Sequence, residues 1–426
     1  MSCAWITRTR PPIGRAPGLP AKAGCARGAT RLAAALLAVA VALIGLGSPS
    51  LADDIPEAVI ERLSERQRSD YQVYLAAQAK HEAALSAFWS RVEEKRADRR
   101  RKRSAGELIA PDDYVLAFPP EYDGPKLAAD IARILDEVRK SEPASPRLIP
   151  SIPDVLAGAK AVYGFVPERI SEREFKRRYA IDALAHGLTK DQVVKIYALE
   201  TGGQGTYDMQ AGINPITRQG QPISTALGYA QLLHANSVDE LVNHGEDFSR
   251  RLLAKAQAPG VPATRAAALK QKARAVRKML ANARSVPNVW REHVRFAGTE
   301  KGIGIHALNL DGDIGPWLQA VKLNGLRETG AKNGLNALTG AEIELMNLAG
   351  PMTGVEMLQP LAWDVPTVNF FARRGYEVNS VVRKRTAREL LLEIDRRMLS
   401  GLQKPGAVEF ATVFDEVAAA RSASAR

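Results

Sequence analysis

Helical periodicity runs through almost all of the chain after Asp154, and few stretches alternate polar and apolar residues as β-strands do. Apolar residues that recur three and four positions apart give each predicted helix one apolar stripe. A chain with this pattern buries its stripes by packing helix against helix. We therefore expect a mainly α fold.

The first 52 residues have the features of a targeting segment. A basic stretch without acidic residues is followed by an apolar run from Leu32 to Gly47, and then by the small-x-small cleavage signal Ser50-Leu51-Ala52. The apolar run is short for a membrane-spanning helix and suits a secretory signal peptide. We expect cleavage before Asp53 and a periplasmic or secreted mature protein.

Both cysteines, Cys3 and Cys25, lie in this signal segment. The mature protein then has no thiol for catalysis, disulfide formation or metal binding. The histidines form no His-x-x-x-His pair that would favour a zinc site. The acidic loop at 309–315 has Ile314 where a calcium loop needs glycine, which favours an ordinary tight loop. We expect no metal and no cofactor.

Basic residues exceed acidic ones by a small margin once the signal segment is removed. This balance suits an anionic polymer or a membrane surface as partner, and export argues against nucleic acid. The most basic stretch, Arg99-Arg100-Arg101-Lys102-Arg103, ends a long polar helical pattern. It is either a solvated helix end or a patch for anionic wall polymers or lipid headgroups.

A cluster of prolines between 143 and 153 marks the clearest domain boundary. The residues before it read as long polar helices, whereas those after it read as a continuous helical domain. We expect four segments along the chain: a signal peptide at 1–52, an N-terminal helical segment with a proline-rich linker at 53–150, a helical domain at 151–400, and a C-terminal tail at 401–426.

The predicted helix at 189–200 is the most informative segment for function. A capping box at Thr189 begins it, and Gly202-Gly203 suits the left-handed turn that ends a helix. Glu200 lies in the last turn on the apolar face, where burial and the negative end of the helix dipole favour its protonated form. Glu200 is therefore a candidate general acid, with a frayed, solvated glutamate as the alternative.

Two later motifs follow this helix in the chain. Leu227-Gly228-Tyr229-Ala230-Gln231-Leu232-Leu233 comes after a polar, irregular stretch, and Met346-Asn347-Leu348-Ala349-Gly350-Pro351 lies further on. With Glu200-Thr201-Gly202-Gly203, these motifs resemble in order the Glu-Ser-Gly, Gly-Leu-Met-Gln and Tyr-Asn-Ala-Gly-Pro motifs of the lysozyme-like lytic transglycosylases. The resemblance is to the catalytic domain of the soluble members. It spans roughly residues 152–398 and is dense only over 185–233.

The resemblance implies a lysozyme-like helical catalytic domain at 151–400. The stretch between Gln231 and Asn347 is longer than in compact members of the family, so a large helical insertion is expected at about 235–340. The implied substrate is the glycan strand of peptidoglycan. Glu200 would protonate the glycosidic oxygen between N-acetylmuramic acid and N-acetylglucosamine. It would then act as the base that lets the muramyl C6 hydroxyl close a 1,6-anhydro ring.

The resemblance also implies the residues that bind the substrate: Thr201, Gly228, Tyr229, Gln231, Asn347 and Tyr376. Asp208, in the loop after the helix, is a candidate second carboxylate, with a turn-forming aspartate as the alternative. Two other functions stay open. One is a muramidase that hydrolyses the same bond, and the other is a peptidoglycan-binding scaffold protein without turnover.

Overall fold

The computed structural model describes residues 57–141 and 149–424. Helices make up most of these residues, and β pairing within them is limited to isolated bridges such as that between Gln210 and Leu227. The prediction of a mainly α fold is confirmed, whereas the expected signal peptide at 1–52 lies outside the described residues. None of the helices in these ranges has the length and apolar character needed to cross a lipid bilayer.

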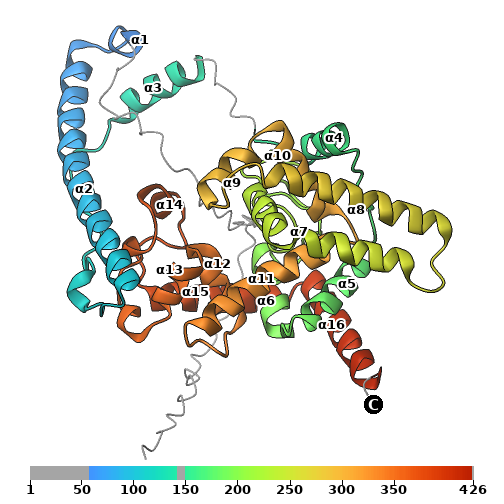
Figure 1. Cartoon of the computed structure of the whole chain (residues 1–426). Coiled ribbons are helices and arrows are strands. Elements are labelled where there is room, and N and C mark those ends of the chain that lie inside the picture. Colours follow the sequence, from blue (N-terminus) through green and yellow to red (C-terminus); the bar gives the residue numbers. More distant parts are fainter. Residues whose placement is uncertain (1–56, 142–148, 425–426) are drawn as a thin grey trace, which may run out of the picture. The chain divides into compact units, whose positions relative to one another are not determined.

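The N-terminal helical segment is built around one long helix (Figure 1). Its elements are α1 (Glu57–Ile60), α2 (Glu65–Ala105), the 3₁₀ turn η1 (Pro111–Asp113) and α3 (Ala129–Ser141). A capping box at Ser64 begins α2, and Gly106 ends it in the left-handed conformation. A small apolar core joins the region of α1, the start of α2 and α3: Val59, Leu63, Tyr71, Ile131 and Val138.

A buried arginine docks the end of α2 onto the helical domain. Arg99 is 1% exposed, and its guanidinium donates 2.7 Å hydrogen bonds to the Glu356 carboxylate and to the Asn369 carbonyl. Arg103 also forms an ion pair with Glu356. The basic run 99–103 was expected to be a solvated end or an anion-binding patch. Arg99 and Arg103 are internal docking residues, because a buried guanidinium needs partners within the protein. Arg100 and Arg101 are exposed, as expected for a solvated helix end.

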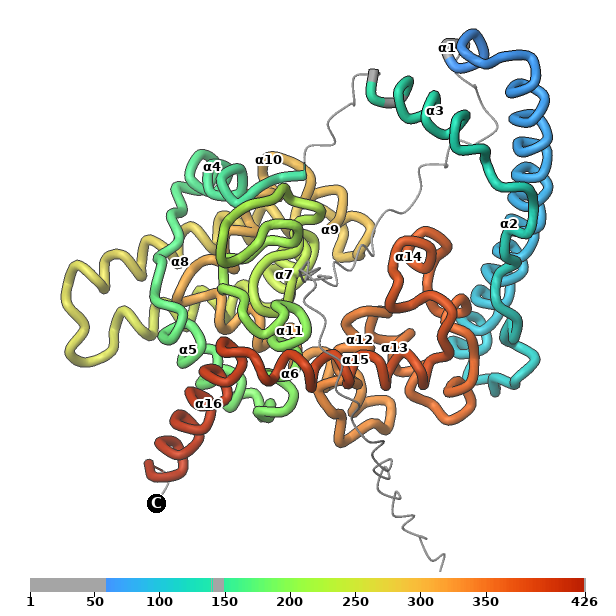
Figure 2. The backbone as a smooth tube through the Cα atoms, turned by 180° about the vertical axis from the view of Figure 1, so that it is seen from behind, coloured from blue at the N-terminus to red at the C-terminus, as the bar shows by residue number. Residues whose placement is uncertain are grey.

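The helical domain follows the linker. Its elements are α4 (Ile152–Tyr163), α5 (Glu172–Ala185), α6 (Lys190–Glu200), α7 (His234–Gln257), α8 (Ala263–Ala283), α9 (Trp290–Ala297), α10 (Glu300–Ile305), η2 (His306–Leu310), α11 (Gly315–Lys332), α12 (Gly340–Ala349), α13 (Pro351–Met357), η3 (Pro360–Ala362), η4 (Thr367–Asn369), α14 (Arg373–Val378), α15 (Ala387–Leu402) and α16 (Pro405–Ser424). Between α6 and α7 the chain is irregular. Figure 2 shows α7 and α8 leading into each other as a helical hairpin.

Two hydrophobic cores divide this domain. The larger one gathers side chains from α5, α6, α12, α15 and α16, and the second lies among α4, α7, α8 and α10. Helix α7 starts at His234, close to the expected start of the insertion at about 235–340. Helix α11, inside that range, also contributes Leu323 and Leu326 to the larger core. The second core also takes Val155 and Ala159 from α4, before that range, so the expected insertion shares both cores with the rest of the domain.

Helix α6 lies in the larger core, in contact with α12, α15 and α16. The expected capping box is present, since the Thr189 hydroxyl accepts from the Gln192 backbone at 3.3 Å and the Gln192 side chain accepts from the Thr189 backbone at 3.0 Å. From Gln192 to Glu200 every residue except Lys195 is buried. The helix is thus enclosed on nearly all sides, where the sequence pattern indicated one apolar face.

Residues 401–426 were expected to be a tail, but most of them form helix α16. This helix packs against α5 and α6 and buries four apolar side chains: Ala407, Phe410, Val413 and Phe414. The turn between α15 and α16 lies directly on the end of α6. A Cβ atom added to Gly203 would lie 2.2 Å from the carbonyl oxygen of Gly401, so the contact requires glycine at this position.

Substitutions at Gly202 and Gly203 can distinguish the effect of backbone strain from that of packing. Both glycines have a positive φ angle, +63° and +70°, so a side chain would be strained at either position. A Cβ atom at Gly202 meets nothing within 4 Å, whereas one at Gly203 meets backbone. We expect Gly202→Ala to lower the free energy of unfolding by about 1–2 kcal/mol through strain alone. Gly203→Ala should lower it by about 3–4 kcal/mol, since overpacking adds to strain. Urea denaturation measures both; equal losses would contradict the close contact.

Arg99→Ala should weaken the docking of α2, because it removes a buried cation and leaves the Asn369 carbonyl without its 2.7 Å donor. We expect a loss of about 3 kcal/mol in the free energy of unfolding. Arg100→Ala is the matched control, since Arg100 is the exposed neighbour and surface substitutions change stability by less than about 0.5 kcal/mol. Urea denaturation of both variants is the measurement, and similar effects would refute the docking role.

Candidate active site

Glu200 is the last residue of α6, and its side chain is enclosed by protein. The residue is 1% exposed, and both carboxyl oxygens are closed off from solvent. Apart from a neighbouring carboxyl group, no hydrogen-bonding partner for either oxygen is found among the described residues. The frayed, solvated glutamate weighed at the sequence level is therefore not what the structure shows.

The neighbouring carboxyl group belongs to Glu344, on α12, which is fully buried. Burial raises the pKa of Glu200 well above the glutamate value of 4.5, and the charge of Glu344 raises it further. Burial also raises the pKa of Glu344, but its contact with Glu200 acts in the opposite direction. The two buried carboxyl groups therefore hold a proton between them that separate, solvated glutamates would release. The C-terminal end of the α6 dipole favours the same arrangement.

Contacts between the starts of α6 and α12 bring the two carboxyl groups together. The Gln192 side chain donates to the Leu338 carbonyl at 2.7 Å, and the Gly340 backbone donates to the Asp191 carboxylate at 2.9 Å. Glycine is needed at 340, because a Cβ atom there would lie 2.7 Å from the Asp191 carbonyl oxygen. With the helix starts joined, Glu344 in the middle of α12 faces the last turn of α6.

Asn347, predicted from the third motif, lies beside this carboxyl pair. Its side-chain nitrogen is 3.5 Å from both oxygens of Glu344, one helical turn earlier on α12. Asn347 is half-buried, whereas Glu344 is fully buried, so Asn347 lies between the carboxyl pair and the surface. Sequence reasoning found Asn347 but missed Glu344. The available signal was a glutamate three positions before the motif asparagine on an otherwise apolar helix.

The second motif forms a tight hairpin. Leu227 and Leu232 exchange two backbone hydrogen bonds of 3.0 Å, and the Gln231 side chain donates to the Gly228 carbonyl at 2.8 Å. Gly228 has a φ of +79°, and Gln231 has a φ of +42°, which is strained for a residue with a side chain. Predicted residues Gly228 and Gln231 therefore define the shape of this hairpin.

An aromatic contact places the hairpin against the last turns of α6. The rings of Tyr229 and Tyr197 meet edge to face at 4.7 Å, and Tyr197 is three residues before Glu200. Tyr229 itself is 1% exposed, and its hydroxyl donates to Glu172. In this conformation the ring contacts other side chains of the protein, and its expected role as a substrate contact stays a prediction. Tyr229 instead joins the hairpin to the core beneath the carboxyl pair.

Buried histidine and glutamine side chains fix the other side of the hairpin. His306 Nε2 donates to the Thr225 carbonyl at 2.8 Å, while Nδ1 accepts from the Ser237 hydroxyl at 2.8 Å. Burial lowers the pKa of His306 to about 3, so the ring is neutral at ordinary pH. The Gln319 side-chain oxygen accepts from the Ala230 backbone at 3.1 Å. These contacts tie the second motif to the region of α7 and α11.

Two further predicted substrate contacts have structural roles. The Thr201 hydroxyl donates to the Tyr197 carbonyl at 2.6 Å and so closes the end of α6. Tyr376, on α14, is 4% exposed; its ring meets Trp89 of α2 at 5.6 Å, and its hydroxyl accepts from the Lys384 backbone at 3.0 Å. Both side chains are buried in contacts of the protein with itself.

Asp208 is held by cations. It forms ion pairs with Arg169 and Arg218 and accepts from the Thr206 hydroxyl at 2.6 Å. Burial alone would raise the pKa of Asp208, but the hydrogen bond from Thr206 and the two arginines lower it. The carboxylate that accompanies Glu200 is thus Glu344, and Asp208 organises the loop after α6.

The acidic loop at 309–315 also has internal partners. The Asp311 carboxylate accepts from the Glu168 backbone at 2.8 Å and forms an ion pair with Lys272 at 2.8 Å. Within residues 57–141 and 149–424, no group of three or more histidine, cysteine or acidic residues is arranged to hold a metal ion.

Comparisons of the chain with protein-family models, with curated proteins and with solved structures found no match. The resemblance to lytic transglycosylases therefore rests on the three motifs, and the lysozyme-like fold stays a prediction. Two of these motifs converge in the described structure, since Asn347 contacts the carboxyl partner of Glu200. The second motif, at 227–233, packs against α6 through the contact between Tyr229 and Tyr197.

The carboxyl pair should make stability depend on pH. Its raised pKa values mean that the folded protein keeps a proton that the unfolded chain releases above about pH 4.5, the glutamate value. Stability should therefore fall as pH rises above that value. Glu344→Gln removes the like charge, and we expect it to reduce the loss between pH 5 and 8 by about 1–2 kcal/mol.

Urea denaturation across this pH range measures the difference between variant and wild type. The comparison with wild type is needed because Glu240 also makes stability depend on pH, since burial raises its pKa to about 7. Glu246→Gln, at an exposed ion pair with Arg284, is the matched control and should keep the wild-type slope. Identical slopes for Glu344→Gln and wild type would show that the two carboxyl groups do not share a proton.

Proposed function

We propose that this protein is a peptidoglycan lytic transglycosylase, with a lysozyme-like catalytic domain, that acts outside the cytoplasm. The observation that carries the proposal is the buried Glu200 carboxyl at the end of α6, beside Glu344 and Asn347, where burial and the Glu344 charge raise its pKa. A carboxylic acid that stays neutral near pH 7 is the group needed to protonate a glycosidic oxygen. The motif order and the signal peptide expected at 1–52 support the same substrate.

The proposed reaction uses one glutamate twice. Glu200 donates its proton to the oxygen between N-acetylmuramic acid and N-acetylglucosamine, and the bond from that oxygen to the muramyl C1 breaks. The charge at C1 develops as an oxocarbenium-like cation. The Glu200 carboxylate then takes the proton of the muramyl C6 hydroxyl while that oxygen bonds to C1. The 1,6-anhydro product forms without water, and Glu200 is protonated again.

Glu344 is proposed as a positioning residue for this chemistry. Its negative charge favours the protonated form of Glu200 in the resting enzyme. The same charge favours the cation that develops at C1. Asn347, 3.5 Å from both Glu344 oxygens, orients that carboxylate and has a half-buried amide for sugar hydroxyl or acetamido groups.

The proposal requires a local opening, because the Glu200 oxygens are closed off from solvent. The irregular segment 201–233 leads from Glu200 to the second motif, and residues 216–221 within it are exposed. Movement of this segment, or rotation of the Glu200 side chain away from Glu344, would bring the acid to a glycan strand. Loops that close over substrates commonly move in this way.

The closed conformation does not have the geometry of an inverting hydrolase. Such an enzyme keeps its carboxyl groups about 6.5–9.5 Å apart so that a water molecule fits between acid and base, whereas Glu200 and Glu344 interact directly here. The opening that brings Glu200 to substrate changes this separation, so analysis of the products distinguishes transglycosylation from hydrolysis. The closed position of Glu200 favours the other alternative, a wall-binding scaffold protein without turnover, and the experiment below includes it.

Digestion of purified sacculi tests the proposal. Wild-type protein should release muropeptides with 1,6-anhydro ends, each one water lighter than the product of hydrolysis. Glu200→Gln should lower the rate of release by about 100- to 10,000-fold, the contribution of a general acid. Glu246→Gln should keep the wild-type rate, since Glu246 is exposed and outside the site. Mass spectrometry of the products gives rate and chemistry together.

The other outcomes have defined meanings. Free reducing ends instead of anhydro ends would identify a muramidase. Sacculus binding without product from wild-type protein would identify a scaffold. A Glu200→Gln variant that is folded by circular dichroism and fully active would refute the assignment of Glu200.

A further inference from the structure

A cavity that does not include Glu200 lies between α5, α7 and α8. Its volume is about 390 Å³, and its lining includes Arg177 and Arg178 from α5, Arg251 and Lys255 from α7, and Arg265 from α8. Two carboxylates, Asp182 and Asp313, also line it. None of the carboxyl-pair residues contributes to this lining. The cavity thus presents five cations and two anions to any molecule inside it.

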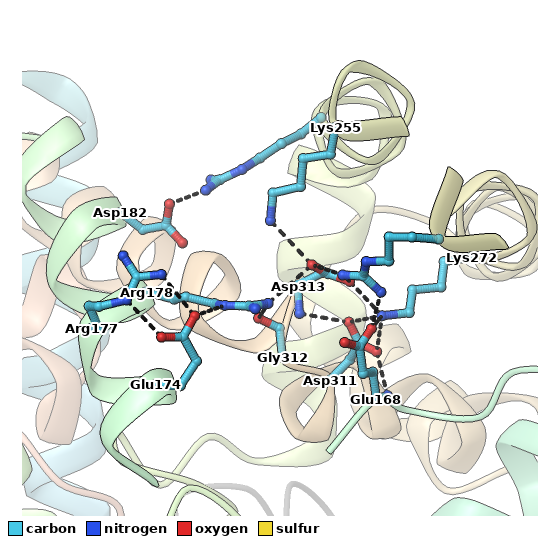
Figure 3. Close-up of polar contacts among 12 residues, drawn as sticks. Glu168, Glu174, Arg177, Arg178, Asp182, Lys255, Lys272, Asp311, Gly312 and Asp313 are labelled. Atoms are coloured by element: carbon cyan, nitrogen blue, oxygen red, sulfur yellow. Dashed lines mark hydrogen bonds and ion pairs between the residues drawn. The ribbon is translucent and has the colours of Figure 1, made fainter. Parts of the chain in front are cut away.

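Four cations surround the Asp313 carboxylate. Figure 3 shows Lys255 and Lys272, from two different helices, both directed toward its carboxylate. Arg178 and Arg265 form ion pairs with the same group, at 3.2 Å and 2.7 Å. Three of these cations have further acidic partners, since Arg178 also pairs with Glu174, Arg265 with Glu168, and Lys272 with Asp311 and Glu168. Lys255 differs from them, because Asp313 is the one ion-pair partner that the described residues give it.

Lys255 is the cation with the weakest partner in this group. Its distance to Asp313 is 3.4 Å, against 2.6 Å for Lys272, and it has no other ion-pair partner among the described residues. Burial lowers the pKa of Lys255, so its charge is poorly solvated as well as poorly paired. An anion beside Lys255 would relieve both conditions.

Arg251 is rigidly held with donors to spare. Its guanidinium lies 3.8 Å from the centre of the Trp317 ring, and one of its terminal nitrogens pairs with Asp182. A guanidinium has five N–H donors, so this single ion pair leaves several unused. A stacked, oriented guanidinium binds planar oxyanions with little loss of side-chain freedom.

Apolar side chains complete the lining. Ile181 of α5, Val261 of the α7–α8 turn and Leu269 of α8 face the same cavity. A site made of cations and branched aliphatic side chains suits a ligand with an oxyanion at one end and a short hydrocarbon part at the other.

We propose that this cavity binds a small oxyanion-bearing ligand, a carboxylate or a phosphate with a short aliphatic part, through Lys255 and Arg251. This inference goes beyond the proposed glycan cleavage and does not depend on it. The alternative is that the ion pairs serve only to cross-link α5, α7 and α8, which would explain why the acids are buried. It leaves unexplained why Lys255, with one 3.4 Å ion pair, and Arg251, with unused donors, both line the cavity.

Calorimetric titration of the full-length protein tests the proposal. The two probes are glutarate, as a dicarboxylate with a short aliphatic chain, and inorganic phosphate, both at constant ionic strength. We expect wild-type protein to bind at least one of them, and Lys255→Gln to weaken that binding by about tenfold, the loss of one charge-assisted contact. Lys270→Gln is the matched control, since Lys270 is exposed on α8 and outside the lining.

Each result is decisive. Binding that Lys255→Gln weakens and Lys270→Gln preserves supports the site, and the preferred probe identifies carboxylate or phosphate as the ligand group. No binding of either probe to wild-type protein at millimolar concentration would overturn the proposal. Equal weakening by both variants would also overturn it, because it would show a general effect of net charge. Circular dichroism of each variant confirms that it is folded.

Discussion

The structure depends on the exclusion of water from the end of α6. The turn between α15 and α16 lies against Gly203 so closely that a single added carbon would collide with the Gly401 carbonyl. Glu200 is enclosed beside this turn, with α12 on another side. An acid in such surroundings keeps its proton, since ionisation would place a second charge next to Glu344 without solvation. The glycines around the helix end are thus part of the acid chemistry, although none of them touches the carboxyl group.

The features that could be predicted from the sequence are those set by residues close together in the chain. The capping box at Thr189, the glycine pair after Glu200 and the mainly α class all depend on neighbouring residues, and each agrees with the structure. Glu344 could not be found in this way, because its partner is far away in the chain and only packing brings the two together. The surroundings of Tyr229 also depend on packing between distant segments. Its motif position indicated a substrate contact, whereas its ring completes an aromatic cluster with Tyr197 and Phe410.

Charged runs proved the least informative pattern. The basic run at 99–103 looked like a solvated surface, yet Arg99 is among the most deeply buried side chains of the protein. The pairs around Asp313 show the same effect, because their lysines and arginines come from helices that the sequence separates. The sign of a charge is visible in a sequence, but its partner is a property of the fold. Burial and pairing therefore decide whether a run of charges joins helices or faces a ligand.

The continuity of α2 has a mechanical consequence. The helix comprises 41 residues without interruption, which corresponds to a rod about 60 Å long. Its first turns hold the small core with α3 around Tyr71, and its last turns are locked to the helical domain by Arg99. These two points are about 40 Å apart along the rod. A continuous helix keeps the distance between these two points fixed, whereas a flexible linker would let it vary. A molecule bound at the first turns of α2 would therefore lie at a defined distance from the domain that contains Glu200.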